Sequence, residues 1–275
     1  MLSLSSPAKI NLFLRILGRR ADGYHELASL FQAIELADTL HFEKNSKNSL
    51  TCSDPALPVD ESNLIVKAQR LFQRKTGIME SFAIHLEKRI PVQAGLGGGS
   101  SNAASTLWGL NTLSGYPATE QQLCEWGSEL GSDVSFFLSS GTAYCTGRGE
   151  IVTSLDPLPS QSLNIIKPPK GLSTIEVYKN LNPVTLSQID PNQIVVSFYQ
   201  NNPIYINDLE SSAFALMPEL AILKQKLKNS GYSTVLMSGS GSSLFCFGKG
   251  DLQIENHQVF STSFTNRITG NWYKF

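Results

Sequence analysis

The sequence of 275 residues lacks the features that mark several classes of protein. It has 22 basic and 23 acidic residues, so its net charge of -1 shows none of the basic excess of proteins that coat nucleic acid. No apolar run approaches the roughly 20 residues of a membrane span. The first residues lack the basic start and the cleavage site of a signal peptide. We therefore expect no nucleic-acid partner and no membrane association.

Cysteine and histidine are also scarce, with four of each in the chain. No CxxC pair occurs, and no two histidines stand at the spacing of metal ligands. This pattern argues against a disulfide framework and a zinc site, and it predicts reduced thiols in a cytoplasmic protein. We expect no side chains that hold a metal by themselves.

The composition predicts a folded mixed α+β chain. Hydrophobic residues make up 41% and charged residues 16%, which allows a sizeable core in two domains. The segment LDPLPS at 155–160 holds two prolines in six positions, so we place a domain boundary there. The predicted domains are residues 1–156 and 157–275.

Hydrophobic periodicity and turn residues predict the individual elements. Those of the first domain are strands at 8–16, 27–36, 38–43, 49–53, 82–86, 142–146 and 149–154, a helix at 62–76, and helices ended by Gly115 and Gly131. Those of the second domain are strands at 162–167, 234–238, 243–248 and 257–263, and helices at 173–181, 188–201, 207–216 and 218–229. Thr119 and Gln122 predict a capping box.

The first strand has a clear alternation, which predicts one buried face. Its apolar face carries Ile10, Leu12, Leu14 and Ile16, and its other face carries Lys9, Asn11, Phe13 and Arg15. Lys9 and Asn11 can therefore point together into a cleft. From the spacing alone, Lys9 could also be a solvated strand residue.

The segment PVQAGLGGGSSNAA at 91–104 has four glycines within five residues. Clustered glycine is costly unless the backbone must adopt unusual angles or closely approach another group. A strand leads into this loop and a helix of small residues leads out, so free amides at the helix start could bind phosphate. A flexible surface turn is the alternative. The loop matches neither GxxxxGK[ST] nor GxGxxG.

Three segments together resemble the GHMP kinase superfamily. They are PAKINLFL at 7–14, the glycine loop, and SGSGSSLFCFG at 238–248. The resemblance implies an α+β fold in which the first domain is like domain 2 of ribosomal protein S5 and the second is ferredoxin-like. It places the active site in the cleft between them.

Further segments resemble one family within this superfamily, the kinases of 4-diphosphocytidyl-2-C-methyl-D-erythritol. The most discriminating is ADGYHEL at 21–27, and GSDVSFFL at 131–138 and NDLE at 207–210 also match. Gln93 and Ala94 depart from the small residues, often glycine, that the family carries there. The resemblance implies transfer of the ATP γ-phosphate to the 2-hydroxyl of this cytidine diphosphate derivative, in the non-mevalonate isoprenoid pathway. It also implies Mg²⁺ held mainly by the ATP phosphates.

The resemblance assigns roles to residues at matching positions. Asp133 would be the catalytic base, kept ionised by Lys9. The ATP-binding residues would be Pro91, Val92, Gln93, Ala94, Gly95, Leu96, Gly97, Gly98, Gly99, Ser100, Ser101 and Asn63. The substrate-binding residues would be Asn11, Tyr24, His25, Thr174, Tyr178 and Gly239.

Taken by themselves, several of these residues allow a second interpretation. Asp133 and Asn63 could be helix caps. Tyr24 and His25 could form a packing plug or a stacking surface for a base. Tyr178 also fits the face of an amphipathic helix.

Three other functions fit parts of the pattern. A different GHMP kinase, such as homoserine kinase, would keep the glycine loop but has no need of ADGYHEL. A non-catalytic anion-binding or RNA-binding protein would need a basic surface. An inactive relative would be expected to have damaged motifs. No feature of the sequence indicates an oligomeric state.

Overall fold

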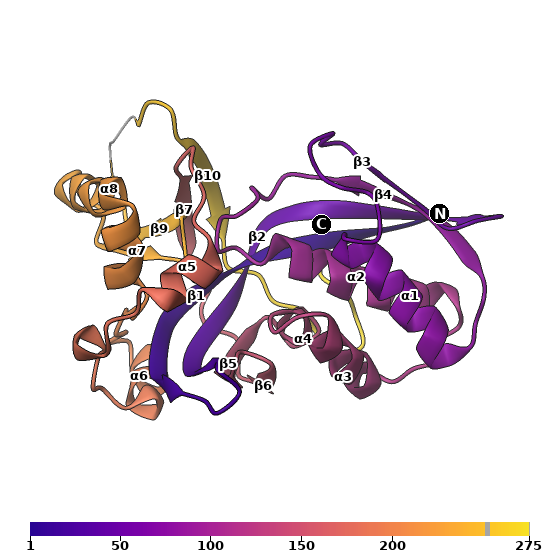
Figure 1. Cartoon of the computed structure of the whole chain (residues 1–275), viewed down its shortest axis with the longest axis horizontal. Helices are drawn as coiled ribbons and strands as arrows, with labels where there is room; N and C mark the ends of the chain where they lie inside the picture. The colour runs from indigo at the N-terminus through magenta and orange to yellow at the C-terminus, as the bar shows by residue number, and fades with distance from the viewer. Residues whose placement is uncertain (251–253, 275) are drawn as a thin grey trace.

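The computed structural model describes residues 1–250 and 254–274, which form two lobes (Figure 1). The first lobe is built on a six-stranded sheet of order β3-β4-β2-β5-β6, with β1 paired to β2. Its strands are β1 (Leu2–Arg19), β2 (His25–Asn45), β3 (Ser49–Cys52), β4 (Ser81–Glu87), β5 (Thr142–Gly147) and β6 (Ile151–Ser154). Its helices are α1 (Leu64–Thr76), α2 (Gly98–Leu113), α3 (Glu120–Leu130) and α4 (Val134–Phe137). Only the β3–β4 pair is parallel among these described pairings.

The second lobe is built on an antiparallel sheet of order β10-β7-β9-β8. Its strands are β7 (Ser162–Lys167), β8 (Thr234–Met237), β9 (Leu244–Phe247) and β10 (Gln258–Ser263). Its helices are α5 (Thr174–Lys179), the 3-10 turn η1 (Pro183–Thr185), α6 (Pro191–Tyr199), α7 (Glu210–Leu216) and α8 (Pro218–Asn229).

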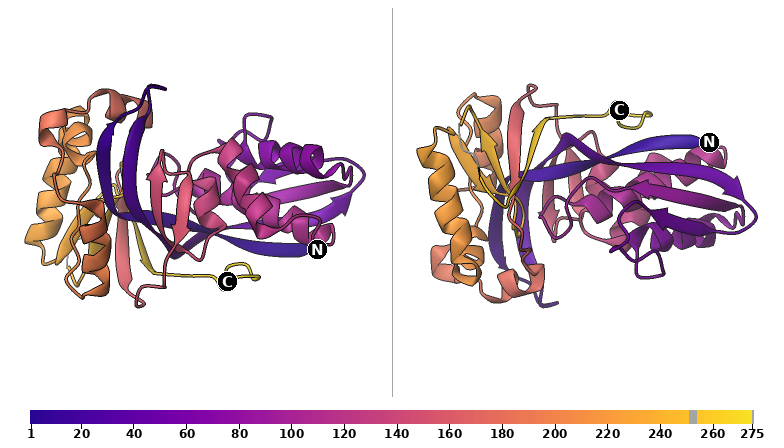
Figure 2. Two further views of the ribbon diagram at one scale, coloured as in Figure 1. Left: turned by 90° about the horizontal axis from the view of Figure 1, so that it is seen from below. Right: turned by 90° about the horizontal axis from the view of Figure 1, so that it is seen from above.

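The long hairpin of β1 and β2 connects the two lobes. It begins in the first lobe and reaches the second, where its tip lies beside α5 and α6 (Figures 1 and 2). Ile10 and Phe13 of β1 share a core with Ile165 and Phe245 of the second sheet. The second sheet is thus packed between this hairpin and its own helices, because α8 lies against the opposite face.

The end of the chain returns to the first lobe. Trp272 and Tyr273 are buried in the core under the first sheet. Arg267 donates to the main-chain oxygens of Leu138 and Ser139, just after α4, and pairs with Glu120 at 2.7 Å. The terminal segment therefore fastens α4 to the lobe.

Several predictions about the elements are confirmed. Gly77 ends α1 in the left-handed conformation, with φ of 73°. Thr119 and Gln122 form a capping box at α3. The two-domain GHMP architecture is confirmed. The boundary at residues 156 and 157 stays a prediction.

Other predictions were wrong. Residues 27–36 and 38–43 belong to one continuous strand, β2. The strand is irregular at the position where its pairing with β1 changes register, between Pro7 and Ala8 of β1. Residues 4–16 are buried on both faces rather than one. The extra burial arises because the second lobe covers the side of β1 that faces away from α2. The helices predicted at 188–201 and 207–216 are shorter at their ends, at 191–199 and 210–216.

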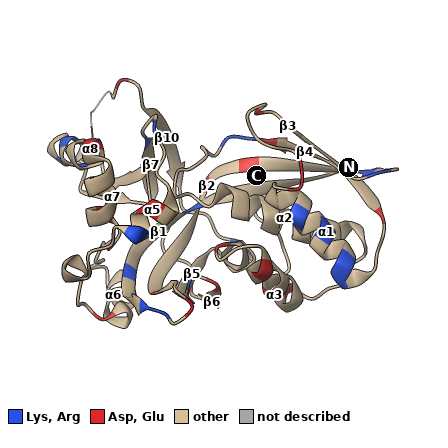
Figure 3. Cartoon of the chain, viewed as in Figure 1, with Lys and Arg blue, Asp and Glu red and all other residues tan. Residues whose placement is uncertain are grey.

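Charges of both signs are spread over both lobes (Figure 3). In the part of the chain that the structure describes, no helix is long and apolar enough to cross a membrane.

Candidate active site

A cavity of about 1130 Å³ lies where the two lobes meet. Its walls come from β1, the tip of the β1–β2 hairpin, the glycine loop, the start of α4, α5 and the turn after β8. Segments distant in the sequence therefore contribute to one cleft, as the resemblance implied.

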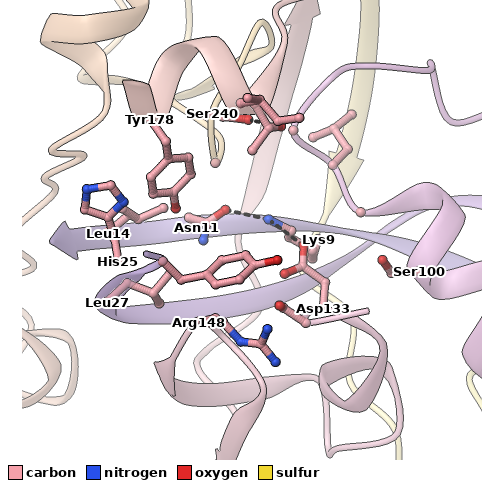
Figure 4. Close-up of a pocket in the computed structure, with 18 of the residues that line it drawn as sticks. Lys9, Asn11, Leu14, His25, Leu27, Ser100, Asp133, Arg148, Tyr178 and Ser240 are labelled. Atoms are coloured by element: carbon pink, nitrogen blue, oxygen red, sulfur yellow. Dashed lines mark hydrogen bonds and ion pairs between the residues drawn. The ribbon is translucent and has the colours of Figure 1, made fainter. Parts of the chain in front are cut away.

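Lys9 and Asn11 project from β1 into this cavity (Figure 4). Lys9 Nζ donates to Asn11 Oδ1 at 2.7 Å, and Asn11 Nδ2 donates to Ser29 Oγ at 2.9 Å. Lys9 is only 4% exposed, so it is not the solvated strand residue that its spacing also allowed. Its ammonium also lies 4.6 Å from the centre of the Phe31 ring.

A β-bulge in β1 changes which residues face the cavity. The register with β2 shifts between Asn11 and Phe13, so one extra residue enters β1 and the alternation reverses beyond it. Leu14 and Ile16 therefore line the same cavity as Lys9 and Asn11. The prediction that they share the face of Ile10 was wrong, because strict alternation cannot anticipate a bulge.

Asp133 stands directly before α4, where a capping aspartate would be found. Its side chain makes no capping hydrogen bond to the helix. Instead, its Oδ2 lies 3.4 Å from Lys9 Nζ, and 30% of the side chain remains exposed toward the cavity. The cap interpretation of Asp133 was therefore wrong, and the carboxylate is paired with a buried cation and open to a ligand.

The glycine loop leads into α2 with its first amides unblocked. Gly97 occupies the capping position with φ of 71°, and no side chain caps the helix. A Cβ at Gly97 would lie 3.0 Å from both Lys9 Cγ and the Phe137 ring, so glycine is needed for space as well as conformation. The amides at the start of α2 are thus available to an anion beside Lys9.

The glycine loop is also bound to the second lobe. Ser238 Oγ donates to the Gly95 main-chain oxygen at 2.9 Å, and the Ser243 amide donates to the Ala94 oxygen at 3.2 Å. Gln93 adopts a left-handed φ of 51° and packs against Gly171. The loop is therefore shaped by contacts from both lobes, despite having two non-glycine residues at its start.

The other end of the cavity is lined by rings and apolar side chains. The His25 and Tyr178 rings lie 5.3 Å apart between centroids at 34° (Figure 4). Burial, with a smaller effect of Arg19, lowers the pKa of His25 below its ordinary value of 6.5. Burial raises the pKa of Tyr178 well above its ordinary value. Both groups are therefore neutral near pH 7, which suits them to contact an uncharged ring.

Of the neighbours Tyr24 and His25, Tyr24 is the exposed one, with 57% of its surface accessible. The Arg148 guanidinium lies 4.9 Å from the centre of its ring. On the opposite wall, Thr174 Oγ1 and Ser240 Oγ are 2.8 Å apart. Gly239, with φ of 56°, lies next to Lys9 and Asn11.

The structure brings nearly all the predicted site residues to this cavity. Two exceptions are Asn63 and Ser101. Asn63 Oδ1 accepts from the Ile65 amide at 2.9 Å, so its interpretation as a helix cap is confirmed. Ser101 is fully buried and accepts from Ser6 Oγ at 2.9 Å. Their proposed contacts with ATP stay predictions that this geometry does not favour.

Sequence reasoning missed other residues of the cavity wall, among them Lys88 and Arg148. Lys88 pairs with the buried Asp38 at 3.0 Å beside the glycine loop. Lys88 stands three residues before Pro91, where the glycine loop begins, and a basic residue beside a predicted phosphate-binding loop could have been picked out from the sequence. Arg148 lies in the turn between β5 and β6, and it stands in no motif that would have singled it out.

The described residues contain no group of three or more His, Cys, Asp or Glu side chains that could hold a metal. Asp133 is the one acidic side chain among the described residues of the cavity wall. The chain by itself therefore offers a hard cation one carboxylate and nearby hydroxyl and main-chain groups.

Comparisons with known proteins identify the family of the chain. The model of the GHMP kinases N terminal domain matches residues 63–141, and that of the GHMP kinases C terminal domain matches 193–257. The chain is 56% identical to 4-diphosphocytidyl-2-C-methyl-D-erythritol kinase of Protochlamydia amoebophila (strain UWE25), over 98% of this chain and 92% of that protein.

Solved structures give the same result. The crystal structure of a 4-(cytidine 5'-diphospho)-2C-methyl-D-erythritol kinase is 34% identical, covering 96% of this chain and 99% of that one, with a TM-score of 0.82. A homoserine kinase from Cytophaga hutchinsonii is 18% identical, covering 96% and 95%, with a TM-score of 0.66, so it shares the fold alone. The chain is therefore a kinase that belongs to the 4-diphosphocytidyl-2-C-methyl-D-erythritol kinase family of the GHMP kinases.

Proposed function

We propose that this enzyme transfers the γ-phosphate of ATP to the 2-hydroxyl of 4-diphosphocytidyl-2-C-methyl-D-erythritol, in the non-mevalonate pathway to isoprenoid precursors. The observation that carries the proposal is the position of the Lys9–Asp133 pair. It lies between the free amides at the start of α2 and the end of the cavity lined by His25 and Tyr178. A phosphate donor on one side and a ring-bearing alcohol on the other would meet at this pair.

In this proposal, the ATP phosphates lie against the glycine loop. The main-chain amides of Gly98, Gly99 and Ser100 precede the first complete helical turn and are available to phosphate oxygens. These donors are fixed before ATP binds, because contacts from Ser238 hold the loop. Fixed donors stabilise the charge of the transferring phosphoryl group without reorganisation during the reaction.

The acceptor hydroxyl would approach Asp133. The carboxylate takes the proton as the hydroxyl oxygen bonds to phosphorus, and ADP leaves in line. The Lys9 ammonium holds the carboxylate in place at 3.4 Å and offsets the negative charge that gathers at the phosphoryl group. Asn11 fixes the Lys9 ammonium through its 2.7 Å hydrogen bond.

Mg²⁺ fits this arrangement as a companion of ATP. The Ser100 hydroxyl, beside the free amides of α2, could contribute one ligand, and most of the coordination would come from phosphate oxygens and water. When bound, the ion neutralises phosphate charge.

The cytosine ring would lie at the end of the cavity formed by His25 and Tyr178. Their neutral rings give it stacking surface, while Leu14 and Leu27 exclude water from its edge. The hydroxyls of Thr174 and Ser240, 2.8 Å apart, are available to the polar part of the substrate.

A panel of acceptors tests the proposal. The purified enzyme is incubated with ATP, Mg²⁺ and one alcohol at a time: 4-diphosphocytidyl-2-C-methyl-D-erythritol, homoserine, mevalonate or galactose. We expect phosphorylation of the cytidine diphosphate derivative alone, at its 2-hydroxyl. Faster phosphorylation of homoserine or another acceptor would contradict the proposal, and ³¹P NMR of the product identifies the hydroxyl.

A further inference from the structure

The segment NDLE at 207–210 lies outside the described cavity wall, yet its polar side chains bond to elements that form that wall. It follows a short extension of the first sheet. The Leu14 amide donates to the Ile206 oxygen at 2.7 Å, and the Asp208 amide donates to the Leu14 oxygen at 2.9 Å. The segment therefore continues along the free edge of β1, directly beyond the bulge.

Asn207 fixes the turn that carries Gly239. Its Nδ2 donates to the main-chain oxygens of Met237 at 2.7 Å and Gly239 at 2.8 Å, and its Oδ1 accepts from the Leu209 amide at 2.9 Å. The side chain is 6% exposed, so water cannot replace these partners at low cost. Two donations and one acceptance require an amide at this position.

The Gly239 turn is placed close to the reacting groups. A Cβ at Gly239 would lie 3.4 Å from Asn11 Oδ1 and 3.5 Å from Lys9 Nζ. Ser240, the next residue, shares a 2.8 Å hydrogen bond with Thr174 of α5. A shift of this turn would therefore displace the wall that faces Asn11 and also the hydroxyl pair.

Asp208 fixes two further parts of the wall. Its Oδ2 accepts from the Ile16 amide at 2.8 Å and from Arg15 Nε at 3.0 Å. Its Oδ1 accepts from the Ser187 amide at 3.1 Å. Arg15 also donates to the main-chain oxygens of Ser187 and Ile189. The buried ion pair of Arg15 and Asp208 thus holds the segment after η1 against β1. Ile16 of β1 and Leu186 of that segment both line the cavity.

We propose that Asn207 and Asp208 are positioning residues for the acceptor end of the cavity. Together they set the distance between the Gly239 turn, the part of β1 beyond its bulge, and the segment after η1. The inference rests on the proposed function, because it assumes that this end binds the cytidine diphosphate derivative. It predicts that changes here impair use of this substrate more than use of ATP, which the Gly239 turn affects indirectly, through the bond of Ser238 to the glycine loop.

The substitution Asn207→Asp tests Asn207. Aspartate keeps the size of the side chain but loses both donors and sets a carboxylate against two carbonyl oxygens. We expect kcat/KM for the cytidine diphosphate derivative to fall about 10-fold or more, since buried bonds are lost. The KM for ATP should rise by a smaller factor, because the turn reaches the glycine loop indirectly, through Ser238. Asn207→Ala removes the donors without adding charge, and it should show the same split.

Asn111→Asp is the matched control. Asn111 is similarly buried, donating to and accepting from the main chain of Ala118 at 2.9 Å, but it lies at the end of α2 outside the cavity wall. We expect it to lower the free energy of unfolding and to leave both KM values unchanged. Asp208→Asn should resemble the Asn207 variants in its kinetic split.

The outcomes separate the two proposals. If the wild-type enzyme does not phosphorylate the cytidine diphosphate derivative, the proposed function fails and this inference with it. If the wild type is active and the Asn207 variants change neither kinetic constant, or change both KM values equally, only the inference is overturned. If both Asn207 variants fail to fold, the amide is needed for folding of the whole chain. That result would also overturn the inference that Asn207 is a positioning residue.

Discussion

A Cβ on Gly95 would lie 2.1 Å from the main-chain oxygen of Ser238. The glycine loop of the first lobe and the turn after β8 in the second lobe therefore contact each other through main-chain atoms, with no room for a side chain at Gly95. Gly95 also adopts a left-handed φ of 73°. The bond from Ser238 Oγ to the Gly95 oxygen holds the two turns together.

Gly95→Ala should therefore damage both stability and activity. The new methyl group would push Ser238 away and misplace the glycine loop. The free energy of unfolding should therefore fall by roughly 2 kcal/mol or more, and the KM for ATP should rise. Gly77→Ala is the matched control, because Gly77 has the same φ of 73° and no atom within 4 Å of a Cβ. It should cost about 1 kcal/mol and leave the KM unchanged. Equal effects in urea unfolding would contradict this account.

His25→Ala should weaken binding of the acceptor. Loss of a stacked ring costs about 10-fold in affinity, so the KM for the cytidine diphosphate derivative should rise by roughly that factor while the KM for ATP changes less than about twofold. Steady-state kinetics with each substrate varied in turn measures both constants. His85→Ala, an exposed histidine on β4, is the control and should change neither. A similar rise in both constants for His25→Ala would count against this assignment.

The lowered pKa of His25 predicts how stability depends on pH. The unfolded chain binds a proton at the ordinary value of 6.5, whereas burial keeps the folded imidazole neutral to lower pH. The stability that comes from this difference is therefore present above pH 6.5 and is lost as the pH falls through the folded pKa.

Urea unfolding of the wild type and His25→Gln, from about pH 8 to about pH 5, measures this effect. The wild type should lose stability relative to the variant as the solution becomes acidic. A constant difference, or a relative gain by the wild type at low pH, would show that burial does not lower the pKa of His25.

Much of the site could be predicted because its residues stand in local motifs. The glycine loop, the pair Lys9 and Asn11, and the His25 turn each have a spacing that directs side chains to one place. Their meeting in one cavity is a long-range result, and only the family resemblance indicated it. The ion pair of Lys9 with Asp133 follows from that resemblance, whereas the lack of a capping bond at Asp133 required the structure.

The bulge in β1 shows where sequence reasoning fails in physical terms. Alternation correctly placed Lys9 and Asn11 on one face, but one extra residue reversed the pattern for Leu14 and Ile16. The bulge lies where β1 pairs with β2 and, just beyond it, with the segment at 206–208, and the residues of β1 alone indicate neither pairing. Arg148 was missed for a similar reason, since only the fold brings its turn to the cavity.

The central claim is that Asp133 takes the proton of the acceptor hydroxyl while Lys9 holds it in place. Asp133→Asn keeps the shape of the side chain and removes the base, and Asp156→Asn, an exposed position between the lobes, is its control. The decisive measurement is kcat of Asp133→Asn beside the affinity for ATP, obtained by calorimetry. We predict a kcat lower by about 10³-fold or more with ATP affinity within about twofold. A kcat close to that of the wild type would contradict the account.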